Sequence, residues 1–228
     1  MNAHLGSAFP ANYDQERLHN LGELVRSRME SNPKVAVAPF PDIEIFVAGD
    51  FMTLGECSRM IEMIDAAAQP STLFDADYVT SGYRTSFSAN FDPKDPFVAE
   101  ISGRIDALLG IQGPLGETIQ GQRYLPGQEF KQHHDWFHHG TDYWDREMQK
   151  GGQRSFTAMA YLNKVEGGGG TSFPHLDMTF EPSPGALIIW NNACPDGLAN
   201  PRTLHAGCPV VNGSKYVITK WYRTRPWL

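Results

Sequence analysis

The chain has 228 residues, of which 41% are hydrophobic and 20% charged, and 19 basic and 26 acidic residues give it a formal net charge of −7. This length and composition fit one globular domain and exclude a collagen-like, coiled-coil or largely disordered chain. The negative charge argues against a nucleic-acid partner or an anionic membrane surface, because no overall field attracts phosphate groups.

The sequence predicts a soluble, cytoplasmic protein. No apolar stretch reaches the roughly 20 residues of a membrane span, and the first residues lack the basic and then apolar order of a signal peptide. The three cysteines, Cys57, Cys194 and Cys208, are too few and too scattered for a disulfide framework or a cysteine zinc site. Each is expected to be a small buried hydrophobic residue.

Three helices are predicted in the first half of the chain. Apolar residues at helical spacing indicate the first helix over residues 14–30. A capping box at Thr53–Glu56 begins the second helix, which Pro70 ends. The third helix occupies residues 95–110, with Asp-Pro at its start and Gly at its end.

Short β-rich runs separated by Gly and Pro dominate the second half, after one earlier strand over residues 43–47. This spacing favours a closed or double-sheet β domain over alternating βα units. We therefore expect an α+β fold in which helices buttress a β-sandwich or jelly roll. The later runs are Thr118–Tyr124, Ser155–Leu162, Ala186–Trp190 and Tyr216–Tyr222.

The densest polar cluster runs from Gln132 to His139, with four histidines and one aspartate in eight residues. On a strand, the side chains of His133 and Asp135 leave the same face and can reach one ion. His205, just before the last strand, is the best candidate for a third ligand. Two histidines and a carboxylate form the facial triad that leaves positions open on Fe(II), although zinc hydrolases use the same ligands.

Other histidines and glycines have plainer interpretations. A lone His-x-Asp pair is frequent by chance. His138 and His139 are rival ligands, but the polar run after them favours a surface loop. His175 is interpreted as a turn residue. The glycines at 167–170 are interpreted as part of a hairpin, because no Gly-Lys-Ser/Thr follows to complete a phosphate loop.

The last strand places a cation on its predicted inner face. Period-two alternation puts Lys215, Val217, Thr219, Trp221 and Arg223 on one side. If this side faces the interior, Lys215 requires an anion to offset the cost of burying its charge. A dicarboxylate co-substrate would supply that anion, whereas a solvated lysine at the strand end is the alternative.

Several motifs, in order along the chain, resemble those of the prolyl 4-hydroxylase branch of the 2-oxoglutarate- and Fe(II)-dependent dioxygenases. The likeness covers most of the chain, from about Ile43 to Trp221. The motifs are Arg84–Ser86, Arg123–Phe137, Gly151–Asn163, Gly168–Pro174 and His205–Val210, followed by Lys215 and Trp221.

The resemblance implies a double-stranded β-helix of cupin-like shape, and an enzyme that hydroxylates a C–H bond while 2-oxoglutarate is decarboxylated to succinate. It implies O₂ as co-substrate, with ascorbate as a further candidate cofactor. The implied iron ligands are His133, Asp135 and His205. Lys215, with help from the hydroxyls of Tyr124 and Thr171, is implied to hold 2-oxoglutarate.

The resemblance also implies substrate contacts at Arg154, Trp221 and Arg84. Phe130 departs from the family, which usually carries tyrosine there, and this weakens the expectation of a proline substrate. We expect a helical extension over residues 1–40 and a single catalytic domain over residues 41–228.

Four functions therefore compete. Hydroxylation of a prolyl residue in a peptide or protein is the leading hypothesis, and hydroxylation of another amino acid or a small molecule is the second. A non-catalytic cupin-like binding module and a zinc hydrolase are the others. The sequence does not decide the oligomeric state.

Overall fold

An eight-stranded antiparallel sheet is the largest element of the fold. The computed structural model describes residues 14–72 and 82–227, so residues 1–13 of the expected extension lie outside the described part. In spatial order, the strands are β1 (Ala36–Val37), β2 (Ile45–Ala48), β11 (Leu187–Asn191), β7 (Arg154–Tyr161), β14 (Lys215–Arg223), β5 (Gln120–Tyr124), β4 (Phe87–Asn90) and β3 (Gln69–Pro70).

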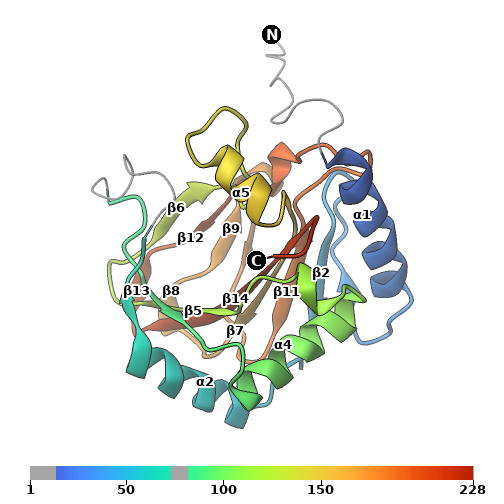
Figure 1. Ribbon diagram of the computed structural model, residues 1–228. Coiled ribbons are helices and arrows are strands. Elements are labelled where there is room, and N and C mark those ends of the chain that lie inside the picture. The colour runs from blue at the N-terminus through green and yellow to red at the C-terminus, as the bar shows by residue number, and fades with distance from the viewer. Residues whose placement is uncertain (1–13, 73–81, 228) are drawn as a thin grey trace.

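A smaller antiparallel sheet faces the first one. Tyr161, Trp190 and Val217 of the large sheet pack with Phe173 of the small sheet in one buried cluster. This double layer, together with the helices, confirms the predicted α+β fold with a jelly-roll core (Figure 1). The small sheet comprises β10 (Met178–Phe180), β9 (Thr171–Phe173), β12 (His205–Gly207) and β6 (Phe130–His133), and β13 (Val210–Asn212) pairs separately with β8 (Gly167–Gly168).

The three predicted helices are present as α1 (Gln15–Glu30), α2 (Leu54–Ala67) and α4 (Pro96–Leu109). They lie outside the barrel formed by the strands (Figure 1). Their apolar stripes and the outer side chains of the large sheet form the other main buried cluster, which includes Val25, Met60, Ile101, Phe156 and Ile218. The helices thus bury the face of the sheet that does not contact the small sheet.

Local sequence signals explain where α2 and α4 begin and end. The Thr53 side chain accepts a hydrogen bond from the backbone N–H of Glu56, and the Glu56 carboxylate accepts one from the backbone N–H of Thr53. Asp95 caps α4 by accepting from the backbone N–H of Phe97. Gly110 ends α4 with φ 72°, a left-handed conformation that favours glycine.

Four local predictions differ from the structure, the first being the burial of the cysteines: Cys57 is buried, but Cys194 and Cys208 are only partly buried. The predicted loop after His139 contains a short helix, α5 (Trp144–Lys150), which is stabilised by burial of Trp144 and Met148, a tertiary effect. β6 ends at His133, so Asp135 lies just beyond the strand. The glycines predicted to form a hairpin instead include the strand β8, which pairs with the distant strand β13. Gly168 there has φ +71°, and a Cβ atom would lie 2.3 Å from the Pro209 carbonyl oxygen.

Within the described ranges, three one-turn 3₁₀-helices connect these elements. They are η1 (Gly113–Leu115), η2 (Pro174–Leu176) and η3 (Pro201–Thr203). His175 lies in η2, which agrees with its interpretation as a turn residue.

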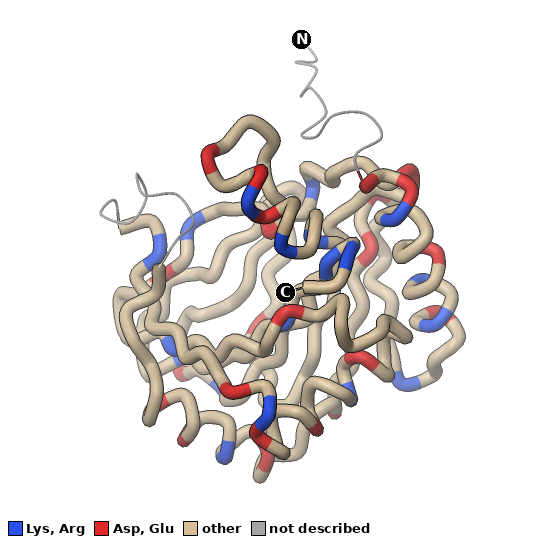
Figure 2. The backbone as a smooth tube through the Cα atoms, viewed as in Figure 1, with Lys and Arg blue, Asp and Glu red and all other residues tan. Residues whose placement is uncertain are grey.

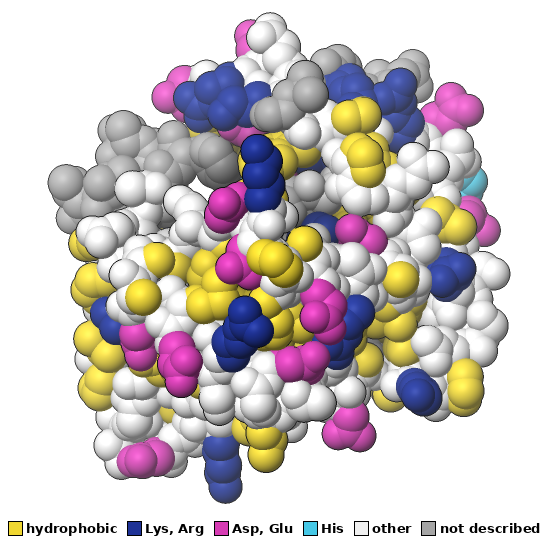
Figure 3. Space-filling view, turned by 60° about the horizontal axis from the view of Figure 1, so that its bottom comes forward, with side chains coloured by type: hydrophobic (Ala, Val, Ile, Leu, Met, Phe, Trp, Pro, Cys, Tyr) yellow, Lys and Arg dark blue, Asp and Glu magenta, His cyan; other side chains and the backbone are white. Residues whose placement is uncertain are grey.

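Charged residues of both signs are distributed over the outside of the molecule. Figure 2 shows acidic and basic residues interspersed along the outer helices. In the space-filling view of Figure 3, they are mixed with hydrophobic side chains across the face that comes forward. None of the helices in the described ranges is both long and apolar enough to cross a membrane.

The capping box predicts a measurable contribution to stability. Thr53→Ala should lower the free energy of unfolding by about 1 kcal/mol, because the backbone N–H of Glu56 at the start of α2 loses the Thr53 hydroxyl as its acceptor. Ser58→Ala is the matched control on the same helix: its hydroxyl bonds only to the Leu54 carbonyl oxygen, and its loss should change stability by less than about 0.5 kcal/mol. Urea unfolding of both variants tests this, and equal stabilities would contradict it.

Candidate metal centre and adjoining pocket

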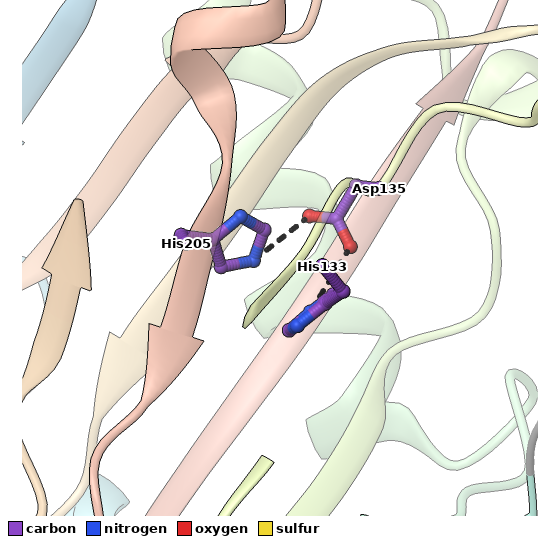
Figure 4. Close-up of side chains that lie close together, drawn as sticks. All are labelled: His133, Asp135 and His205. Atoms are coloured by element: carbon purple, nitrogen blue, oxygen red, sulfur yellow. Dashed lines mark ion pairs between the residues drawn. The ribbon is translucent and has the colours of Figure 1, made fainter. Parts of the chain in front are cut away.

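Two strands bring three potential metal ligands together. His133 ends β6, His205 begins β12, and the two residues are register partners in the antiparallel pair. Asp135 follows two residues after His133. Its Oδ1 lies 3.9 Å from His133 Nε2, and its Oδ2 lies 3.7 Å from His205 Nε2 (Figure 4). The three ligand atoms lie within 4.8 Å of one another, a spacing that suits one shared ion.

Backbone hydrogen bonds fix the orientation of both imidazoles. Nδ1 of His133 lies 2.8 Å from the Lys131 carbonyl oxygen, and Nδ1 of His205 lies 2.8 Å from the Thr203 carbonyl oxygen. A carbonyl oxygen only accepts, so each Nδ1 carries the proton and donates. Nε2 of each ring therefore faces Asp135, and in the neutral tautomer with the proton on Nδ1 it carries the lone pair that metal coordination requires.

The protonation states also suit a metal. Burial and the neighbouring His205 hold the pKa of His133 well below its ordinary value. Burial opposes ionisation of Asp135, but His205, His133 and Arg154 outweigh it, so the pKa of this carboxyl is lowered. A neutral His133 ring and an ionised Asp135 carboxylate are the forms that bind a cation, so these residues fit a divalent metal without rearrangement.

A narrow pocket adjoins the three ligands. The large sheet contributes Lys215, Val217, Thr219 and Trp221, which are alternate residues of β14. The alternation predicted for this strand is confirmed, because Ile218 and Tyr222 pack instead against the helices. Other lining residues include Tyr124, Phe130 and Thr171.

Lys215 is a buried cation whose direct polar contacts are with neutral groups. The residue is only 2% exposed. Its Nζ lies 3.4 Å from Thr171 Oγ1 and 3.5 Å from the Gly170 carbonyl oxygen. The ammonium also lies over the rings of Tyr124 and Tyr161, 5.2 and 5.4 Å from their centroids. Among the described residues it forms no ion pair, and burial lowers its pKa to about 8.

Arg154 and Trp221, two of the predicted substrate contacts, lie together. The Arg154 guanidinium donates to both carboxylate oxygens of Glu117, at 2.7 and 2.9 Å, and lies 4.2 Å from the centroid of the Trp221 ring. The pair with Glu117 is buried, so it fixes the position of the guanidinium. Sequence reasoning missed Glu117, because nothing local marks an acidic residue ahead of a strand as the partner of a distant arginine.

Arg84, the third predicted substrate contact, does not line the pocket but contacts Phe130, which does. Its guanidinium donates to Ser86 Oγ at 3.1 Å and to Ser88 Oγ at 3.0 Å, and lies 4.8 Å from the centroid of the Phe130 ring. Phe130 in turn stacks on His133 with ring centroids 3.5 Å apart. Arg84 therefore reaches the metal centre through Phe130 rather than by direct contact with a ligand.

The remaining histidines of the polar cluster lie outside the centre. His134 faces away, with Nε2 3.1 Å from the Pro201 carbonyl oxygen. His138 and His139 are exposed. In the part of the chain that the structure describes, the three predicted ligands form the one group of histidine, cysteine or acidic residues spaced to hold a metal ion.

Sequence reasoning also missed Thr157, whose hydroxyl donates to Asp135 Oδ2 at 2.7 Å. A weak signal was available. In the run Ser155–Leu162, hydroxyl residues alternate with apolar ones, which indicates that the inner face of that strand is polar at one end.

Comparisons with known proteins find the same family throughout. The family described as the 2OG-Fe(II) oxygenase superfamily matches residues 119–223. The chain is 32% identical over 201 residues to Prolyl 4-hydroxylase 1 of Arabidopsis thaliana, with 79% of this chain and 69% of that protein covered. It is 31% identical over 201 residues to Probable prolyl 4-hydroxylase 4 of the same plant, with 77% and 66% covered. The chain thus spans about two thirds of the length of these curated relatives.

A solved structure extends this similarity to three dimensions. The viral collagen prolyl hydroxylase vCPH from Paramecium Bursaria Chlorella virus-1, in its 2OG complex, is similar with a TM-score of 0.61 and 28% sequence identity. The match covers 78% of this chain and 95% of that chain.

The buried charge of Lys215 predicts a cost in stability. Lys215→Met should raise the free energy of unfolding at pH 7, in EDTA, by on the order of 3 kcal/mol, the equivalent of the pKa difference between the unfolded and folded chain. Because the folded pKa of about 8 lies below the unfolded one of 10.5, the unfolded chain binds more protons between these values. The wild type therefore gains stability there, and the advantage of the variant shrinks. Urea unfolding at pH 7 and at pH 10 measures the difference in stability between the variant and the wild type at each pH. A variant less stable than wild type at pH 7 would contradict the prediction.

Proposed function

Because the chain belongs to the prolyl 4-hydroxylase family of the 2OG-Fe(II) oxygenase superfamily, we propose that it hydroxylates a prolyl residue of a peptide or protein. The observation that carries this proposal is the convergence of His133, Asp135 and His205 in a pocket that also holds the buried Lys215. The family does not favour a zinc hydrolase or a non-catalytic binding module.

We assign Fe(II) to the three ligands. The backbone hydrogen bonds at Nδ1 orient the two imidazoles so that each Nε2 can bind the ion. The ionised Asp135 carboxylate offsets part of the charge of the ion. When bound, iron with O₂ and 2-oxoglutarate supplies the oxidation of an unactivated C–H bond, with decarboxylation of 2-oxoglutarate to succinate.

The far carboxylate of 2-oxoglutarate is assigned to Lys215. A buried ammonium that forms no ion pair attracts an anion strongly, because a charge-assisted hydrogen bond offsets its cost of burial. The hydroxyls of Thr171 and Tyr124 are assigned as further donors to the same carboxylate. Thr171 Oγ1 lies 3.4 Å from Lys215 Nζ, and the Tyr124 ring lies next to the ammonium.

The substrate is assigned to the region of Trp221, which lines the pocket, with Arg154 and Arg84 next to the pocket as further contacts. The Trp221 indole offers an apolar surface for a pyrrolidine ring. The Arg154 guanidinium, held by Glu117, offers donors for backbone carbonyl oxygens of a peptide. Arg84 supports the wall that Phe130 forms over His133.

Hydroxylation of another amino acid or a small molecule is the second candidate, and Phe130 favours it. This ring lies on the pocket wall against His133 and carries no hydroxyl group to bind a substrate. A site with fewer polar contacts to the target ring holds a prolyl residue less specifically.

We further propose that residues 1–40 form a helical extension and that residues 41–228 form a single catalytic domain. In support, the α1 residues Leu18 and Val25 are buried against the rest of the chain. Ascorbate as a reductant and a cytoplasmic location complete the proposal.

The proposed reaction predicts a specific product. With Fe(II), 2-oxoglutarate and ascorbate, a proline-rich peptide should gain one oxygen by mass spectrometry, with an equal amount of succinate. His133→Ala and His205→Ala should each abolish both products, because the ion loses an imidazole ligand. His139→Ala is the matched control and should retain them, because this exposed ring lies outside the centre. Oxidation of free proline or a metabolite but not of any peptide would favour the second candidate, and coupled turnover by His133→Ala would refute the ligand assignment.

The assignment of Lys215 predicts a selective loss of co-substrate binding. Lys215→Met should raise the KM for 2-oxoglutarate roughly 10- to 100-fold, because a buried carboxylate loses its charged partner. The dissociation constant for Mn²⁺ alone should stay within about threefold of wild type, since Lys215 is absent from the group of metal ligands. Steady-state succinate assays and metal titration measure the two quantities. An unchanged KM would remove Lys215 from this role.

A further inference from the structure

Two buried side chains form a hydrogen-bonded relay behind the carboxylate of Asp135. Thr157, on β7, has no exposed surface, and its hydroxyl donates to Asp135 Oδ2 at 2.7 Å. Asn192, just after β11, is 1% exposed, and its Nδ2 donates to Thr157 Oγ1 at 3.0 Å. The relay therefore runs from Asn192 through Thr157 to one oxygen of the aspartate.

The backbone holds both members of the relay in place. Thr157 is the register partner of Trp190 in the antiparallel pair of β7 and β11. Beyond that pair, the backbone N–H of Asn192 donates to the Ser155 carbonyl oxygen at 2.7 Å, and its carbonyl oxygen accepts from Asn200 at 3.0 Å. The backbone of Asn192 is thus held by hydrogen bonds at both its N–H and its carbonyl group. This limits the freedom of the Asn192 side chain to turn away from Thr157.

The chemistry of the groups sets the direction of the relay. A hydroxyl has one proton, and an amide NH₂ group only donates. Because Asn192 Nδ2 donates to Thr157 Oγ1, the proton of Thr157 is directed to Asp135. If the amide were reversed, its oxygen would compete for that proton.

The orientation of Asn192 leaves a buried polar atom unsatisfied. Its Oδ1 has no hydrogen-bond partner among the described residues, and a buried acceptor without a partner costs about 1 to 3 kcal/mol. Native proteins keep few such atoms. The benefit that offsets this cost is the fixed donor that Asn192 presents to Thr157.

We propose that Thr157 is a positioning residue of the metal centre and that Asn192 sets the direction of its hydrogen bond. Thr157 occupies Oδ2 and thereby fixes the rotation of the carboxylate, so that Oδ1 stays turned toward His133. This inference rests on the proposed function, because it takes the ion to be bound at the three ligands. Loss of such an outer hydrogen bond to a ligand lowers metal affinity typically 10- to 100-fold.

The test is the dissociation constant for Mn²⁺, measured without 2-oxoglutarate by the electron paramagnetic resonance signal of the free ion. Thr157→Val removes the hydroxyl at nearly constant volume and should raise the constant 10- to 100-fold. Thr157→Ser keeps the hydroxyl and should stay within about threefold of wild type. Asn192→Ala should raise the constant by a smaller factor, because the Thr157 hydroxyl remains but is no longer directed.

Ser155→Ala is the matched control. Ser155 is equally buried on the same strand and on the same side, and its hydroxyl donates to the Tyr222 carbonyl oxygen at 3.1 Å, away from Asp135. Its removal should lower the stability of the fold and leave the Mn²⁺ constant unchanged. A general structural effect would instead weaken Mn²⁺ binding in both Ser155→Ala and Thr157→Val.

The outcomes separate this inference from the proposed function. If wild type and His133→Ala bind Mn²⁺ equally, the metal assignment itself fails. If wild type binds through His133 but Thr157→Val stays within twofold of it, or Ser155→Ala matches the loss in Thr157→Val, the role of Thr157 is overturned. Should circular dichroism show Thr157→Val unfolded, Asn192→Ala decides by the same criterion.

Discussion

The antiparallel pairing of β6 with β12 is the constraint on which the site depends. It sets His133, at the end of one strand, opposite His205, at the start of the other. Each imidazole is also tied to a backbone carbonyl oxygen two residues before it in the chain. The ligands therefore belong to the rigid part of the fold, and the centre is prepared for a metal ion by the same hydrogen bonds that build the small sheet.

The buried cations of β14 differ in whether they form ion pairs. Those that do have a structural role, and the one that does not is proposed to bind a ligand. Lys220, on the helix-facing side, donates to Ser102 and forms an ion pair with Asp106 of α4, so it fastens a helix to the sheet. Arg223 is paired with Glu117 and Glu147. Lys215 alone among these three has no acidic partner in the described ranges, although it is equally buried. A buried charge without a direct ion pair is a place where an anionic ligand can bind.

The segment after Asp135 is secured by contacts from the far ends of the described chain. The buried Gln153 side chain accepts from the backbone N–H of Phe137 at 2.7 Å and donates to its carbonyl oxygen at 2.9 Å. The backbone N–H of Gln153 in turn donates to Asp14, the residue before α1, and Asp14 also accepts from Thr224. Residues near both ends of the described chain thus help to hold the loop that carries a metal ligand.

The sequence by itself determined the elements whose signals are local, and it identified the three residues that we propose as metal ligands. Capping residues defined α2 and α4, strict alternation defined the faces of β14, and motif order defined His133, Asp135 and His205. Only the tertiary structure decided which side chains contact these residues, because a contact between residues far apart in the chain leaves no periodic pattern in the sequence. Glu117 beside Arg154, Thr157 and Asn192 behind Asp135, and the burial that stabilises α5 all depend on how strands from distant segments align. Whether Lys215 faced solvent or the pocket was likewise settled by packing, since alternation identifies two faces but not which one is enclosed.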